Sequence, residues 1–245
     1  MKVAVIGAKG RMGSAVCAAI EETADLELVA CLDASDDISV GTLNGAQVAV
    51  EFTIPQHSKE NVVKLLQAGV HVVVGTTGWT VESRAEIATI AKTAGKNVLI
   101  APNYSISAVL LMKFARQAAA YFESAEIIEL HHPDKLDAPS GTAITTAQIM
   151  AEARDTAGCD LSPDATESGL AGARGAEVSG IQVHAVRLRG LYAHEEVLLG
   201  NPGEQLTIRQ DSFNRSSFMP GILLGIRKVA EYSGVTWGLE HYLSL

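Results

Sequence analysis

Cysteine is scarce in this chain of 245 residues. Only Cys17, Cys31 and Cys159 are present, an odd number with no Cys-x-x-Cys spacing. Such usage excludes a disulfide framework and a cysteine-based zinc site, and it predicts reduced thiols of a cytosolic protein.

Positive charge is also in short supply. The 19 lysines and arginines are outnumbered by 28 aspartates and glutamates, which gives a formal net charge of -9. This balance argues against a general nucleic-acid or anionic-membrane surface. Long apolar runs are missing too: the run from Val3 to Ile6 is too short for a signal-peptide core, and no later stretch has the length of a membrane span. We therefore expect a cytoplasmic globular protein.

Short apolar runs alternate with amphipathic stretches from the N-terminus to Tyr104. Continuous apolar runs indicate strands that are buried on both faces, and their alternation with helical patterns predicts a parallel sheet. The expected strands are residues 2–7, 26–33, 46–53, 71–78 and 97–104. The expected helices are residues 11–22, 57–69 and 81–93. The predicted fold class of this part is α/β, of Rossmann type.

The pattern changes after Tyr104. The next expected elements are a helix, a strand and a helix, at residues 108–122, 125–132 and 141–154. Residues 158–180 are rich in Gly, Ser, Pro and Asp without a hydrophobic period, which indicates a long loop. Three segments at hairpin spacing then predict antiparallel strands, at residues 181–190, 193–200 and 204–212. A final helix is expected over residues 218–232.

The first turn of the chain contains three glycines, Gly7, Gly10 and Gly13, between a predicted strand and a predicted helix. In a phosphate-binding loop the first glycine permits a tight turn, the second lets the backbone approach a pyrophosphate, and the third allows close helix packing. The helix N-terminus adds free N–H groups and partial positive charge. The spacing is GxxGxxG and not the commoner GxGxxG, so a glycine-rich turn without a ligand is the alternative.

Asp33 ends the second predicted strand, where a carboxylate would accept hydrogen bonds from the hydroxyls of an adenosine ribose. A carboxylate that only caps the next turn is the alternative. Lys9 and Arg11 lie in the glycine loop, where cations could pair with a ribose 2′-phosphate. Asp33 thus favours NADH, and the two cations keep NADPH open.

Two further turns lie at the carboxyl ends of predicted strands, Gly75–Gly78 and Ala101–Tyr104. Doubly wound sheets bind their ligands at the carboxyl ends of strands, so both turns are candidates for the nicotinamide end of the site.

The segment from His131 to Ala143 reads HHPDKLDAPSGTA. The segment lacks the spacing of a metal site, because adjacent histidines in a strand point to opposite faces. A serine hydrolase is also not supported, since Ser140 is not in a GxSxG elbow. Ser140 is either the N-cap of the following helix or part of a turn whose free N–H groups bind a carboxylate. With Lys135 and an imidazole nearby, the segment predicts a small anionic substrate.

The fifteen residues from Glu129 to Ala143 closely match the signature of the 4-hydroxy-tetrahydrodipicolinate reductase family, also called dihydrodipicolinate reductase. The resemblance extends over essentially the whole chain, and the compact length with Lys9 and Arg11 in the loop resembles the actinobacterial branch. It implies reduction of 4-hydroxy-2,3,4,5-tetrahydrodipicolinate to tetrahydrodipicolinate, with loss of water, in diaminopimelate and lysine synthesis. NADH or NADPH is the implied cofactor, and no metal is implied.

The resemblance also implies roles for individual residues. His131 matches the family's proton donor or acceptor and Lys135 its proton donor. The positions that bind the substrate carboxylates are His132, Gly141 and Thr142. The positions that match nucleotide contacts are Gly7, Ala8, Lys9, Gly10, Arg11, Met12, Asp33, Gly75, Thr76, Thr77, Ala101, Pro102, Asn103 and Tyr104.

The family's architecture implies a dinucleotide-binding domain at residues 1–105, to which residues 215–245 return. Residues 106–214 then form a central α+β domain with a mixed sheet, for substrate binding and assembly into a homotetramer. The alternatives are another two-domain NAD(P)-dependent oxidoreductase and a nucleotide-sensing module without catalysis. The first has no reason to carry the segment from His131 to Ala143, and the second would not need its His, Lys and Ser-Gly-Thr groups.

Overall fold

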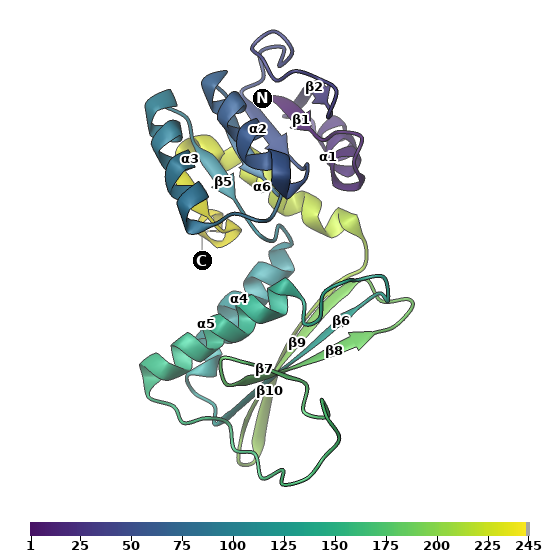
Figure 1. Ribbon diagram of the computed structural model, residues 1–245, viewed down its shortest axis with the longest axis vertical. Helices are drawn as coiled ribbons and strands as arrows, with labels where there is room; N and C mark the ends of the chain where they lie inside the picture. Colours follow the sequence, from purple (N-terminus) through teal and green to yellow (C-terminus); the bar gives the residue numbers. More distant parts are fainter. Residues whose placement is uncertain (244–245) are drawn as a thin grey trace. The chain divides into compact units, whose positions relative to one another are not determined.

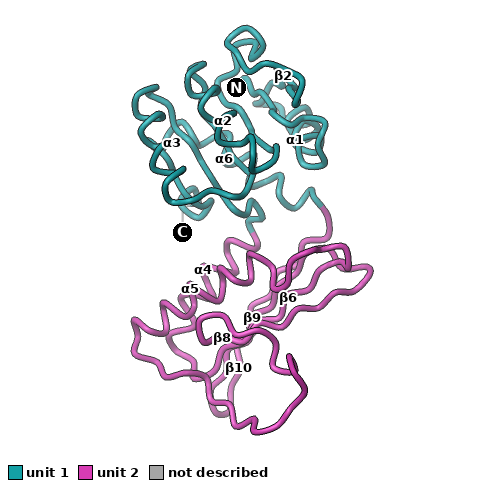
Figure 2. The backbone as a smooth tube through the Cα atoms, in the orientation of Figure 1, with its two compact units in different colours: residues 1–106, 215–245 teal, residues 107–214 magenta. Residues whose placement is uncertain are grey.

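The computed structural model describes residues 1–243 and divides the chain into two compact units, coloured separately in Figure 2. Unit 1 comprises Met1–Ile106 and Arg215–Leu245, and unit 2 comprises Ser107–Asn214. Unit 2 is therefore inserted into the sequence of unit 1. Within residues 1–243, none of the helices has the length and apolar character needed to cross a membrane.

Unit 1 contains a sheet of six parallel strands in the order β11-β5-β4-β3-β1-β2, of which β1, β2 and β5 are labelled in Figure 1. The strands are β1 (Lys2–Ile6), β2 (Glu27–Leu32), β3 (Val48–Glu51), β4 (His71–Val74), β5 (Val98–Ile100) and β11 (Val235–Trp237). All residues of β3 and β5 are buried, as expected for strands covered on both faces. The predicted α/β class with a Rossmann-like parallel sheet is confirmed.

Helices cover both faces of this sheet. They are α1 (Arg11–Glu21), α2 (Pro55–Gln67), α3 (Val81–Ala94) and α6 (Met219–Lys228). Apolar side chains of α2 and α3 pack with alternate residues of the strands in one core cluster. On the other face, a Cβ added to Gly225 of α6 would touch Leu99 and Val73, so the absence of a side chain lets α6 approach β5 and β4 closely.

Unit 2 contains a mixed five-stranded sheet in the order β10-β9-β6-β8-β7. Its elements are α4 (Ile106–Ala119), β6 (Ser124–His131), α5 (Gly141–Ala157), β7 (Ala176–Val178), β8 (Ile181–Arg187), β9 (Ala193–Asn201) and β10 (Glu204–Ser212). In Figure 1, α4 and α5 lie along one face of this sheet. Ala125 and Ile127 of β6 pack against Ala147 and Met150 of α5, so the odd-numbered residues of β6 face the helices.

The predicted hairpin between residues 181–190 and 193–200 is wrong. β8 and β9 run in opposite directions, but β6 lies between them and pairs parallel with β8 and antiparallel with β9. The connection from Arg187 to Ala193 is long enough to pass the end of one strand. Alternation of apolar residues reports which face is buried and not which strand is the neighbour. The predicted hairpin between β9 and β10 is present.

Three further elements differ from the sequence-based expectation. The predicted loop at 158–180 contains β7, which pairs with β8 across a two-residue turn at Ser179–Gly180, both with positive φ. The predicted helix at 218–232 ends at Lys228 and continues as a 3-10 turn at Val229–Glu231. β11 was not predicted, because its three residues are too few to show a pattern. Two other 3-10 turns are Arg215–Phe218 and Leu239–Tyr242.

Candidate active site

The glycine loop after β1 depends on the absence of side chains. Gly7 has φ +82°, and a Cβ there would overlap the carbonyl oxygen of Phe52. A Cβ on Gly13 would overlap the carbonyl of Gly7, so the first turn of α1 lies directly against the loop. The N–H of Gly7 donates to the carbonyl of Leu32 at 2.8 Å, which ties the loop to the end of β2. Gly7 and Gly13 are therefore sterically required.

The N-terminus of α1 has the features of an anion site. Its N-cap is Gly10, no side chain caps it, and its first turn has no acidic residue. The first N–H groups of an uncapped helix need external acceptors, and the helix dipole favours negative charge there. This end of α1 therefore fits a phosphate.

Asp33 lies just after β2 and faces the same loop. Its carboxylate accepts hydrogen bonds from the backbone N–H groups of Lys9 and Ala34, both at 2.8 Å. The bonds from Ala34 and Lys9 lower the pKa of Asp33, so the side chain is ionised at neutral pH. Asp33 thus braces the glycine loop and also supplies an acceptor beside it.

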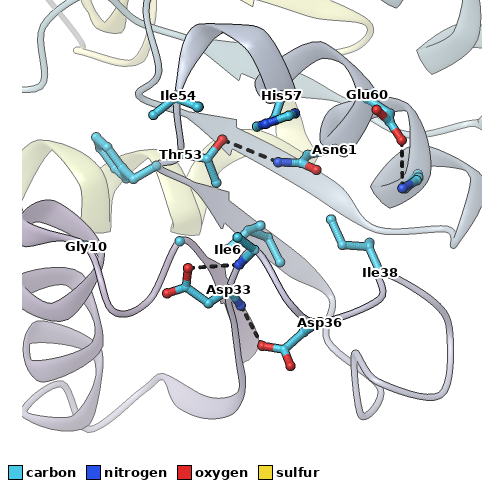
Figure 3. Close-up of a pocket in the computed structure, with 14 residues that line it drawn as sticks. Ile6, Gly10, Asp33, Asp36, Ile38, Thr53, Ile54, His57, Glu60 and Asn61 are labelled. Carbon is cyan, nitrogen blue, oxygen red and sulfur yellow. Dashed lines mark hydrogen bonds and ion pairs between the residues drawn. The ribbon is translucent and has the colours of Figure 1, made fainter.

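Two adjoining pockets lie at the carboxyl ends of β1 to β4. The first has a volume of about 460 Å³ and contains Gly7, Gly10 and Asp33 among its lining residues; Figure 3 shows Asp33 and Asp36 on one side and Thr53, His57 and Asn61 on the other. The second has about 300 Å³. It is lined by Gly10, Arg11, Met12, Phe52, Thr53, Pro55, Gly75, Thr76 and Thr77. Gly10, Phe52 and Thr53 line both pockets, which makes them neighbouring parts of one surface.

The structure brings most of the predicted nucleotide residues to these pockets, but not all. Ala8, Lys9 and the turn Ala101–Tyr104 line neither of them. The Tyr104 side chain is buried, and its hydroxyl donates to the carbonyl of Val74 at 2.8 Å. That phenol anchors the core of unit 1, so any contact from Tyr104 to a ligand would involve its backbone.

Sequence reasoning missed a polar network at the end of β3. Glu51 is fully buried and accepts from the hydroxyl groups of Ser58, at 2.6 Å, and Thr53. The N–H of Thr53 in turn donates to the Thr76 hydroxyl at 2.9 Å. The signal was a glutamate that ends an otherwise apolar strand, since a buried carboxylate requires partners. This network fixes the floor shared by the two pockets.

In unit 2, β6 places Glu129 and His131 on the face of the sheet that α4 and α5 cover. Glu129 is fully buried. His131 Nδ1 lies 2.6 Å from Glu129 Oε2, and both terminal nitrogens of Arg187 donate to the same carboxylate at 2.7 Å. The backbone N–H of Ser140 donates to Glu129 Oε1 at 3.0 Å. Burial raises the pKa of Glu129, but the bonds from His131 and Arg187 outweigh it and hold the pKa at about 2.

Sequence reasoning did not identify Glu129 or Arg187 as site residues. The available signal was the pattern Ala125, Ile127, Glu129, His131, in which two ionisable residues continue the apolar face of a strand. Ionisable groups at buried positions are rare and are usually paired or functional.

The start of α5 answers the question that the sequence left open about Ser140. The Ser140 hydroxyl accepts from the N–H of Ala143 at 3.2 Å, so Ser140 is the N-cap. Next to it, Lys135 Nζ lies 2.7 Å from Asp137 Oδ1. Lys135, and to a lesser extent the N–H of Gly141, lower the pKa of Asp137. A Cβ on Gly141 would meet nothing within 4 Å, so this end of the helix has open space beside it.

His131 and His132 have different partners, as their positions in a strand predict. His131 binds Glu129, whereas the His132 ring lies 6.3 Å from the ring of Tyr192. The two imidazoles therefore do not converge on one ligand atom.

A second carboxyl group is buried beside Glu129. Glu195 of β9 is the register partner of Glu129 and is 2% exposed. Within residues 1–243 its Oε1 atom has no hydrogen-bond partner. Burial raises the pKa of Glu195 to about 7, and the charge of Glu129 adds to the effect.

Comparison with known proteins gives the same family for both parts of the chain. Residues 1–104 match the sequence model of the dihydrodipicolinate reductase N-terminus, and residues 107–243 match that of its C-terminus. A 4-hydroxy-tetrahydrodipicolinate reductase from Streptomyces coelicolor is 58% identical over 246 residues, which cover 100% of this chain and 98% of that protein. The protein of that name from Corynebacterium diphtheriae is 54% identical, with 100% and 99% covered.

Solved structures agree. A dipicolinate-bound dihydrodipicolinate reductase from Paenisporosarcina sp. TG-14 superimposes with a TM-score of 0.88 at 38% identity, covering 99% of each chain. An amine dehydrogenase from Mycobacterium smegmatis has a TM-score of 0.63 at 14% identity over 96% of this chain and 94% of that one, which is a likeness of fold alone.

Proposed function

Because the chain belongs to the dihydrodipicolinate reductase family, an NAD(P)H-dependent oxidoreductase family of diaminopimelate and lysine biosynthesis, we propose that unit 1 binds NADH or NADPH and that unit 2 binds a cyclic dicarboxylate. The reaction is reduction of 4-hydroxy-2,3,4,5-tetrahydrodipicolinate to 2,3,4,5-tetrahydrodipicolinate with loss of water.

The residues of unit 1 fit a dinucleotide. The pyrophosphate would lie over Gly7–Met12, where side chains are sterically excluded at Gly7 and the N-terminus of α1 is uncapped. Asp33 would accept from the ribose hydroxyls, and Lys9 and Arg11 would pair with a 2′-phosphate when one is present. Gly75–Thr77 and the backbone of Ala101–Tyr104 are assigned to the nicotinamide end. When bound, the nicotinamide supplies the hydride that the reduction requires.

The residues of unit 2 fit a dianion. The proposed carboxylate contacts are the backbone N–H groups of Gly141 and Thr142 at the start of α5 and the side chains of His132 and Lys135. Lys135 now contacts the Asp137 carboxylate, and in this proposal a substrate carboxylate takes the place of Asp137 at that ammonium group. His131 donates or accepts a proton, and Lys135 donates one.

A bound ligand in a relative supports the substrate class. The reductase from Paenisporosarcina sp. TG-14 was solved with dipicolinate, a cyclic dicarboxylate. Two carboxylates need two N–H-rich or cationic groups of contacts, and the proposed contacts in the segment from His131 to Thr142 are of that chemistry. Homotetramer assembly through residues 181–211 and a cytoplasmic location remain predictions from the resemblance and from composition.

The observation that carries the proposal is that one short segment, His131 to Thr142, brings together an anchored imidazole, an ammonium group and a helix N-terminus. The test is the loss of reduced-nicotinamide absorbance when the protein meets NADPH or NADH and enzymatically generated substrate. Pyridine-2,6-dicarboxylate should inhibit competitively with substrate, and His132→Ala should mainly raise KM. Absence of turnover with intact nucleotide binding would favour a nucleotide-sensing module instead. Absence of competition at millimolar pyridine-2,6-dicarboxylate would mean that the anion pocket is misplaced.

A further inference from the structure

Three structural features of unit 2 meet at one buried carboxylate. Glu129 accepts from the imidazole of His131, from the guanidinium of Arg187 and from the backbone N–H of Ser140. These partners come from β6 itself, from β8 and from the residue that caps α5. A single side chain therefore connects the proposed acid–base residue to the helix that is proposed to bind the substrate carboxylate.

The bond to His131 selects between the two ring nitrogens. A carboxylate can only accept, so Nδ1 must carry the proton that it shares with Glu129. In the neutral ring Nε2 is then the nitrogen with the free lone pair, and in the charged ring it is the one that can release a proton. The ring is also held against rotation, which lowers the reorganisation needed before proton transfer.

We propose that Glu129 is the positioning residue of this site: its carboxylate fixes the tautomer and orientation of His131, so that Nε2 exchanges protons with the substrate, and it ties that ring to Arg187 and to the start of α5. The inference rests on the proposed role of His131. Glu129 touches neither substrate nor nucleotide in this scheme, so its effect on catalysis passes through His131.

Arg187 and His131 explain how Glu129 keeps its charge although a second carboxyl group is buried beside it. Glu195 faces Glu129 from β9, and two carboxylates so close would repel each other. Glu129 has Arg187 and His131 as charge partners, whereas one oxygen of Glu195 has no partner. The pair therefore divides into a charged member, Glu129, and a member that retains its proton more readily, Glu195.

Glu129→Gln tests the proposal with little change in shape. We expect kcat to fall at least ~10²-fold, the lower end of the contribution of general acid–base catalysis, while the affinities for NADH and for pyridine-2,6-dicarboxylate stay within about threefold. This division separates positioning from general structural damage, because a distorted site would lose ligand affinity as well. A near wild-type kcat, or parallel losses of kcat and of both affinities, would overturn the proposal.

Glu126→Gln is the matched control. Glu126 lies on the same strand and also binds a histidine and an arginine, His184 at 2.7 Å and Arg174. It lies on the face of β6 opposite to Glu129, outside the proposed site. This variant should keep the kcat of the wild type. A loss of kcat equal to that of Glu129→Gln would mean that both glutamates on β6, each with its histidine and arginine, act only by supporting the fold. That outcome would also overturn the proposal.

Removing the Glu129 carboxylate leaves Arg187 without its charge partner, so the single variant could be unstable. Glu129→Leu with Arg187→Met replaces the pair by apolar side chains of similar size, which proteins often tolerate. Long-range nitrogen–proton NMR on histidine-labelled protein then reports the tautomer of His131, assigned by the signal that His131→Ala removes. We expect the Nδ1–H form in the wild type and its loss in the double variant. Unchanged His131 signals would refute the assignment.

The proposed role of His131 and the proposed role of Glu129 can be rejected independently of each other. If His131→Ala keeps full kcat, the proposed role of His131 is wrong, whatever the tautomer. If His131→Ala is impaired and folded Glu129→Gln is not, the reaction scheme stands and the positioning role of Glu129 is rejected.

Discussion

Replacing Glu195 by glutamine should make the protein more stable at alkaline pH, by an amount that depends on pH. Burial raises the pKa of Glu195 from 4.5 to about 7, and Oε1 has no hydrogen-bond partner within residues 1–243. Between pH 4.5 and about pH 7, the unfolded chain releases the proton of Glu195 while the folded protein keeps it. The free energy of unfolding contributed by this group therefore falls as pH rises, and the loss is complete above about pH 7.

The magnitude follows from the same two pKa values. At about 1.36 kcal/mol per pH unit, the interval from 4.5 to about 7 corresponds to about 3 kcal/mol. Glutamine cannot ionise, so Glu195→Gln escapes this loss. We compare the unfolding free energy of the variant with that of the wild type at each pH. This difference, variant minus wild type, should be about 3 kcal/mol larger at about pH 8 than at about pH 4.5.

The assay is urea denaturation at a series of pH values, with the difference between variant and wild type taken at each pH. Taking the difference removes the contributions of ionisable groups that do not interact with Glu195. Glu177→Gln changes an exposed glutamate on β7 and should leave the pH dependence of stability as it is. A difference between Glu195→Gln and wild type that is constant with pH would refute the reasoning, because it would mean that Glu195 ionises equally in both states.

Three other predictions concern the proposed chemistry and assembly. Lys135→Ala and His131→Ala should each lower kcat at least ~10²-fold while NADH affinity is kept; a folded Lys135→Ala enzyme with unchanged kcat and KM would contradict the role of that ammonium. Both NADH and NADPH should serve, and Lys9→Ala with Arg11→Ala should weaken NADPH more than NADH; a wild-type preference beyond roughly a hundredfold, about 2.7 kcal/mol, would disprove dual use. Light scattering should report a homotetramer formed through residues 181–211, and a monomer at micromolar concentration would rule it out.

The parallel sheet and its glycine loop could be predicted because their signals are local. A continuous apolar strand, a turn with Gly7 and Gly13, and an aspartate at the end of the next strand each follow from a few adjacent residues. The structure adds the reason for two of the glycines, namely the close approach of the Phe52 and Gly7 carbonyls.

The interior of the second unit could not be predicted in the same way. Glu129 and Arg187 are 58 residues apart in the sequence, and nothing in the local pattern of either pairs them. The placement of β6 between β8 and β9 also joins segments that are far apart in the sequence. Periodicity identified buried positions, but partners across a sheet depend on register, which only the folded chain defines.

The insertion of unit 2 into unit 1 gives synthesis on the ribosome a fixed order. The whole of Ser107–Asn214 emerges before Val235–Trp237, the strand that pairs with β5. The second unit can therefore fold while the edge of β5 still lacks its neighbour. Nascent chains released before Val235 would carry a complete second unit and an open sheet edge in the first. That truncated form would be the one most prone to pair with strands of other molecules.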